Sequence, residues 1–85
     1  MSTAFQTAVR KNVSADQRRR AIDTLVQNDE RTNLAIIVQL GGLRGEFRQY
    51  ALDGLATCGA TERLEELAED TTLERSLRRR AEDLA

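Results

Sequence analysis

Few side chains in this 85-residue sequence are of the types that carry out acid, base or nucleophilic chemistry. Histidine, the commonest general base and metal ligand, is absent. Cys58 is the single cysteine, and without histidine its thiol has no evident activating base. Glu65 and Glu66 are neighbours on an expected helix, about 100° apart, so they do not converge as an acid–base pair would. We therefore expect no catalysis and keep a small enzyme only as the second alternative function, one that would require a deep pocket with converging polar groups.

The sequence also indicates no cofactor and no metal. It contains no phosphate-binding glycine loop and no CxxC pair. Carboxylates gather in one stretch and could hold a hard cation, but they lack the loop geometry of a calcium site: Glu62, Glu65, Glu66, Glu69 and Asp70. We interpret them as a solvated acidic face.

Arginine is the residue type with the clearest functional pattern, because two triads occupy 18–20 and 78–80. With their neighbours they form a set of candidate phosphate contacts: Arg10, Lys11, Arg18, Arg19, Arg20, Arg78, Arg79 and Arg80. The chain as a whole has a net charge of −1 and only three aromatic residues for base stacking. Arg19 precedes Asp23 by four residues and Arg79 precedes Asp83 likewise, which predicts local pairing. Binding of nucleic acid by the triads is therefore the first alternative function and ranks below local pairing.

The triads belong to a pattern that recurs every 30 residues. Residues 47–55 read Phe-Arg-Gln-Tyr-Ala-Leu-Asp-Gly-Leu, and 17–25 and 77–85 carry Arg, Ala and Asp at the same places without insertion or deletion. A fixed period of this length is typical of stacked repeats. We predict one domain, 1–85, made of repeats at about 1–28, 29–58 and 59–85.

Helix signals recur with the repeat and predict six helices, at about 3–11, 15–27, 30–40, 45–57, 61–69 and 72–84. Ser14 with Gln17, and Thr71 with Glu74, have the spacing of capping boxes. Gly41-Gly42 and Gly59 stand where helix C-terminal caps are expected. The apolar segment 34–38 also suits a buried strand, but it aligns with the plainly helical 64–68, so we predict a helix covered on several sides.

A helical wheel separates the faces of the second helix in each repeat. Phe47, Ala51, Leu55 and Cys58 form a predicted core stripe, and Leu52 lies on its flank beside Arg48. This flank position is Ile22 in the first copy and Glu82 in the third, as expected if the last repeat meets solvent.

The pattern apolar-Arg-x-x-Ala-(apolar)-x-x-Leu, preceded by a helix with Leu-x-x-(Ile/Leu), resembles HEAT-like repeats, closest to the short phycobilisome-lyase-like variety. The resemblance spans Ala4 to Ala85 and implies paired antiparallel helices stacked into a short right-handed α-solenoid of about three hairpins, an all-α fold. Such repeats often carry an aspartate in the turn before the motif arginine, where this chain has Asn12, Gly42 and Thr72. A second run, Asp70-Thr71-Thr72 followed by Arg78 to Glu82, is similar to a small uncharacterised archaeal helical family, which implies a compact helical bundle as the alternative.

The chain has no segment that suggests a signal peptide or a membrane span, and one cysteine cannot form an internal disulfide. We therefore expect a cytoplasmic protein without membrane contact.

The resemblance favours a non-catalytic protein–protein interaction or scaffold module, because such repeats serve many partners on one architecture. The partner-binding candidates are exposed positions of the second helices, with Tyr50 at their edge: Arg19, Asp23, Gln49, Tyr50, Asp53, Arg79 and Asp83. The partner is expected to be another protein. Residues 1–20 carry a net charge of +4 and residues 61–85 a net charge of −3, so head-to-tail self-association is a further option.

Overall fold

The computed structural model describes residues 2–85 and is all-α, with no strand in that range. Met1, the start of the predicted first repeat, lies outside the described residues. Six helices follow one another: α1 (Thr3–Val9), α2 (Ala15–Gln27), α3 (Arg31–Val38), α4 (Gly45–Thr57), α5 (Thr61–Ala68) and α6 (Arg75–Leu84). The predicted helices are confirmed to within two residues at each end, except that α6 begins three residues later than expected.

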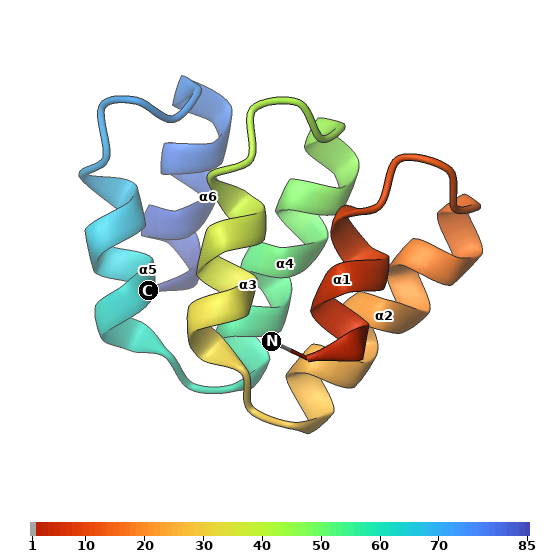
Figure 1. Cartoon of the computed structure of the whole chain (residues 1–85). Helices are drawn as coiled ribbons and strands as arrows, with labels where there is room; N and C mark the ends of the chain where they lie inside the picture. The colour runs from red at the N-terminus through yellow and green to blue at the C-terminus, as the bar shows by residue number, and fades with distance from the viewer. Residues whose placement is uncertain (1) are drawn as a thin grey trace.

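The helices pack as three consecutive hairpins, α1–α2, α3–α4 and α5–α6 (Figure 1). The second helices lie side by side in the order α2, α4, α6, and the first helices in the order α1, α3, α5, so the hairpins form two layers. Two inter-hairpin junctions result. We call the contact of the first hairpin with the second junction 1, and the contact of the second with the third junction 2.

The N-terminal caps of the second helices fall 30 residues apart, at Ser14, Arg44 and Glu74. Ser14 forms the predicted capping box: its Oγ accepts from the backbone N–H of Gln17 at 3.1 Å, and Oε1 of Gln17 accepts from the N–H of Ser14 at 2.9 Å. The box predicted for Thr71 and Glu74 is wrong, because Glu74 is itself the N-cap residue of α6 and makes no side-chain cap bond.

The turns that lead from one hairpin to the next share one geometry. After α4, Gly59 has a φ of 69°, and the N–H groups of Gly59 and Ala60 donate to the carbonyls of Ala56 and Leu55. This is a Schellman cap, as predicted for Gly59. After α2 the same bonds form around Asp29, which takes a φ of 54° although it is not a glycine. Gly41 and Gly42 lie in the turn after α3, but neither has a positive φ. The expectation that they form a left-handed helix cap is therefore wrong.

The core follows the predicted stripe. Phe47, Ala51 and Leu55 are at most 4% exposed, and the flank residues Ile22 and Leu52 are fully buried. Glu82, the third flank residue, is exposed. Cys58 is half-buried at the end of α4 rather than a full member of the stripe. Among the described residues, no helix has the length and apolar character that crossing a membrane requires.

Candidate functional site

The repeated arginine of the second helices is a junction residue. Arg18 and Arg48 are 8% and 4% exposed. Nη1 of Arg18 donates to the carbonyls of Ala8 at 2.6 Å and Arg10 at 2.9 Å, and Nε of Arg48 donates to the carbonyl of Val38 at 2.8 Å. Each arginine therefore satisfies carbonyl groups at the C-terminal end of the preceding helix, where backbone acceptors have no helical partner and the helix dipole is negative.

The two junctions differ in what faces this arginine from the next hairpin. At junction 2, Nη1 of Arg48 donates to Oε1 of Glu74 at 2.7 Å, so a carboxylate of α6's N-cap closes the contact. At junction 1 the residue 30 positions earlier is Arg44, another cation. Arg18 instead lies over the ring of Phe47, with its Cζ atom 5.2 Å from the ring centroid, in a cation–π contact.

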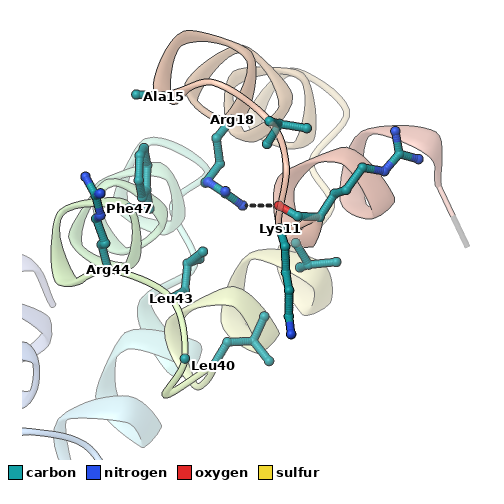
Figure 2. A pocket seen from close by; sticks show the side chains of 11 residues that line it. Lys11, Ala15, Arg18, Leu40, Leu43, Arg44 and Phe47 are labelled. Carbon is teal, nitrogen blue, oxygen red and sulfur yellow. Dashed lines mark hydrogen bonds between the residues drawn. The ribbon is translucent and has the colours of Figure 1, made fainter.

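A cavity of about 520 Å³ opens at junction 1 (Figure 2). Within the described part of the chain, the charged side chains that line it are all cationic: Arg10, Lys11, Arg18 and Arg44. Val9, Val13, Leu40, Leu43 and Phe47 supply apolar walls. Figure 2 shows the guanidinium of Arg18 between Phe47 and the turn that carries Lys11. Its Nε is buried and has no hydrogen-bond partner among residues 2–85.

The exposed side of α2, α4 and α6 carries the predicted partner-binding residues, and we call it the outer face: Arg19, Asp23, Gln49, Tyr50, Asp53, Arg79 and Asp83. Two residue pairs, each 27 positions apart, cross it. Tyr50 donates its hydroxyl to Asp23 at 2.5 Å, and Arg80 donates from Nε and Nη2 to Asp53 at 3.0 and 2.7 Å. Donation to the Asp23 carboxylate, with some burial, raises the pKa of Tyr50 above its ordinary value.

The local pairings expected on this face are not formed between Arg19 and Asp23 or between Arg79 and Asp83. Arg19 pairs with Asp16 at 3.2 Å, because Asp23 is engaged by the neighbouring hairpin. Gln49, Arg79 and Asp83 are exposed.

The arginine triads do not form common surfaces. Arg18 is buried in junction 1, Arg19 is held by Asp16, and Arg80 is held by Asp53. Arg78 is half-buried. The cavity of junction 1 does bring together Arg10, Lys11 and Arg18, three members of the nucleic-acid candidate set.

Sequence reasoning missed Arg44 and the pairing role of Glu74. Aligning the N-cap positions in the 30-residue register would have revealed both, because the residue that faces the junction arginine changes from cation to carboxylate.

A second hollow, of about 710 Å³, lies where α3 and α5 begin and has mixed charge. Its cations have partners of their own: Arg31 pairs with Asp29 at 2.8 Å, and Arg63 donates to the hydroxyl of Thr32 at 2.7 Å. Nearby, burial raises the pKa of the Cys58 thiol. In residues 2–85 no three acidic or cysteine side chains lie close enough together to hold a metal ion.

No family model, curated protein or solved structure matches the chain. The resemblance to HEAT-like repeats therefore stays a prediction.

Proposed function

We propose that the chain is a non-catalytic protein-interaction module, a short right-handed HEAT-like solenoid that presents its outer face to a partner protein. The observation that supports this most is the pair of cross-hairpin bonds from Tyr50 to Asp23 and from Arg80 to Asp53. Side chains that are already held in place lose less conformational entropy on binding, so such a face is prepared for a partner. We assign the module to the cytoplasm, where its free Cys58 would stay reduced.

A charge-swapped variant tests the outer face. Arg79→Glu combined with Asp83→Arg reverses two exposed charges on α6 and keeps the net charge constant. The matched control combines Glu65→Arg with Arg75→Glu, two exposed residues outside the outer face. In pull-downs from the source organism, we expect the first variant to capture at least tenfold less partner than the parent, and the control to capture the same amount. Equal capture by both variants would refute the outer face as the binding surface.

Nucleic-acid binding is a second candidate, supported by the four cations around the junction 1 cavity. A complex formed by phosphate neutralisation would weaken steeply between low and moderate salt. Retardation of DNA or RNA at low salt that vanishes at moderate salt would support it. Absence of retardation at low salt would eliminate it.

A further inference from the structure

We propose that the cavity of junction 1 binds a carboxylate, supplied by a glutamate or aspartate side chain on an extended segment of the partner protein. This rests on the proposed function and adds the chemistry by which the partner would be recognised.

The chain itself shows what such a site accepts. At junction 2 the repeated arginine, Arg48, holds the carboxylate of Glu74 at 2.7 Å. Junction 1 has the same arginine in the same place, but Arg44 stands where Glu74 would be. Arg44 cannot supply an anion to Arg18, so the place taken by a carboxylate at junction 2 is left for an external group at junction 1.

Arg18 has donor capacity that the described chain does not use. Both of its carbonyl bonds come from Nη1, and its buried Nε has no partner among residues 2–85. Nε of Arg78 in the third hairpin is in the same state, so it is the cationic cavity beside Arg18 that distinguishes junction 1. A side chain that is only 8% exposed and carries a charge without an anion is costly to bury. At junction 2 the carboxylate bonds to Nη1 of Arg48, and an incoming acid that reaches the terminal nitrogens of the Arg18 guanidinium would relieve this cost with charge-assisted bonds.

The surroundings favour a peptide over a small inorganic anion. Arg10 and Lys11 add positive charge around the opening, and Arg44, which pairs with Glu46 at 3.7 Å, adds a partly neutralised charge. This potential raises the local concentration of acidic groups. The walls, however, are aliphatic and aromatic, and they suit an apolar residue next to the acidic one. The volume, about 520 Å³, lies within the range of ordinary ligand pockets.

Titration of the isotope-labelled chain with two tripeptides tests the site. The probes are acetyl-Leu-Glu-Leu-amide and acetyl-Leu-Gln-Leu-amide, and the readouts are the NMR signals of the Arg18 Nε–H group and of the backbone amides of residues 42–45. We expect the glutamate peptide to cause saturable shifts there, with a Kd at least tenfold lower than that of the glutamine peptide. Equal affinity of the two peptides, or shifts confined to other residues, would overturn the proposal.

Two variants that lower the net charge by the same amount, one inside the cavity and one outside it, separate binding at the site from a general charge effect. Arg44→Glu places a carboxylate opposite Arg18, as at junction 2, and should weaken the glutamate peptide at least tenfold by occupying the site. Arg75→Glu changes the net charge equally but lies outside the cavity lining, so it should bind within twofold of the parent. Parent-like binding by Arg44→Glu would refute the site.

Inorganic phosphate, titrated in the same way, separates the ligand classes, because tighter binding of phosphate than of the glutamate peptide would overturn the peptide assignment. The two proposals can also fail separately. If the outer-face variants behave as expected but no peptide binds, only the carboxylate site is refuted.

Discussion

Junction 2 is closed by the ion pair of Arg48 with Glu74, whereas junction 1 has Arg44 at the position of Glu74, stacks Arg18 over Phe47 and keeps a cationic cavity. Both junctions use the same positions of consecutive repeats, and both keep the arginine and its bonds to the preceding helix. The comparison separates two tasks of this arginine. Satisfying the helix end is common to both junctions, while the group that faces it from the next hairpin decides whether the junction is closed or open.

The junctions also divide their packing volume differently. At junction 1, Gly54 of α4 faces Val26 of α2 so closely that a Cβ atom on the glycine would lie 2.6 Å from Cγ2 of Val26. Thirty residues on, the two positions are Leu84 and Ala56, a large residue paired with a small one. The larger residue thus stands on α2 at junction 1 and on α6 at junction 2, so the two junctions fill the corresponding positions from opposite sides.

The largest expected effect breaks both junctions at once. Ala51 lies on α4, the helix that the two junctions share, and is 0% exposed. Ala51→Asp would place an unpaired carboxylate in this interface, and we expect a loss of about 4 kcal/mol in the free energy of unfolding. Urea denaturation followed by circular dichroism measures it. Gln49→Asp, exposed on the same helix, is the control; a cooperative Ala51→Asp melt near the parent Tm would contradict the packing.

The next effect is specific to junction 1. Gly54→Ala should destabilise the chain by about 1–2 kcal/mol, because the clash with Val26 outweighs the better helix propensity of alanine. In a Val26→Ala background the clash is gone, and the same change should stabilise by up to about 1 kcal/mol. Four unfolding curves complete the double-mutant cycle. Additive effects would show that the two residues do not limit the approach of the helices.

Exchanging the facing residues should interconvert the two junctions. Glu74→Arg would give junction 2 two facing cations, and we expect a cost of about 1 kcal/mol, limited because the Glu74 side chain is 61% exposed. Arg44→Glu would add an ion pair to junction 1 but would remove the exposed pair of Arg44 with Glu46, so we expect a net stabilisation of less than about 0.5 kcal/mol. Chemical denaturation at low and high salt checks both changes, and the effects should shrink with added salt. Equal signs for the two variants would contradict the comparison.

Much of the fold could be predicted from sequence because it depends on local and periodic signals. The 30-residue period predicted where the helix pairs follow one another. The helical wheel predicted that Phe47, Ala51 and Leu55 lie in the core, and the structure confirms it. The change from Leu52 to Glu82 correctly indicated a buried flank and an exposed one. Where two signals conflicted, the period was the better guide: the capping spacing of Thr71 and Glu74 placed the start of α6 three residues too early.

The candidate site was harder to predict because it depends on contacts between repeats. The Arg48–Glu74 and Asp53–Arg80 pairs join residues 26 and 27 positions apart, which no helical spacing brings together. Arg19 was expected to bond Asp23 four residues on, but the hydroxyl of Tyr50 competes for that carboxylate from the next hairpin.

A smaller effect concerns the turns that enter each junction. Gly59→Asp would force an L-residue into the left-handed region at junction 2 and should cost about 1 kcal/mol. Asp29→Gly relieves that strain at junction 1 but removes the exposed pair with Arg31, so we expect a change within about 0.5 kcal/mol. Thermal unfolding of the two variants and the parent measures the loss of stability that each change causes. A larger loss for Asp29→Gly than for Gly59→Asp would mean that the Arg31 contact, and not the backbone, fixes the first turn.

The smallest effect on stability tests what ends the series of junctions. Ile22 and Leu52 are fully buried at the flank position, and Glu82 is the exposed residue of the third hairpin. Glu82→Leu should change the free energy of unfolding by less than about 0.5 kcal/mol, because the position faces solvent.

The same change would, however, give α6 the apolar flank that α2 and α4 have, and a second copy of the chain could then pack against it head to tail and form a third junction. In the described chain, Tyr50 bonds Asp23 and Arg80 bonds Asp53 across the two junctions. Arg20 occupies the position of Tyr50 and Arg80 in the first repeat, so Arg20 of the second copy would bond Asp83 of the first copy in the same way. Sedimentation over a range of concentrations should show association of Glu82→Leu and reversal by a further Arg20→Glu. A monomer at every concentration would mean that more than the charge of Glu82 closes this end.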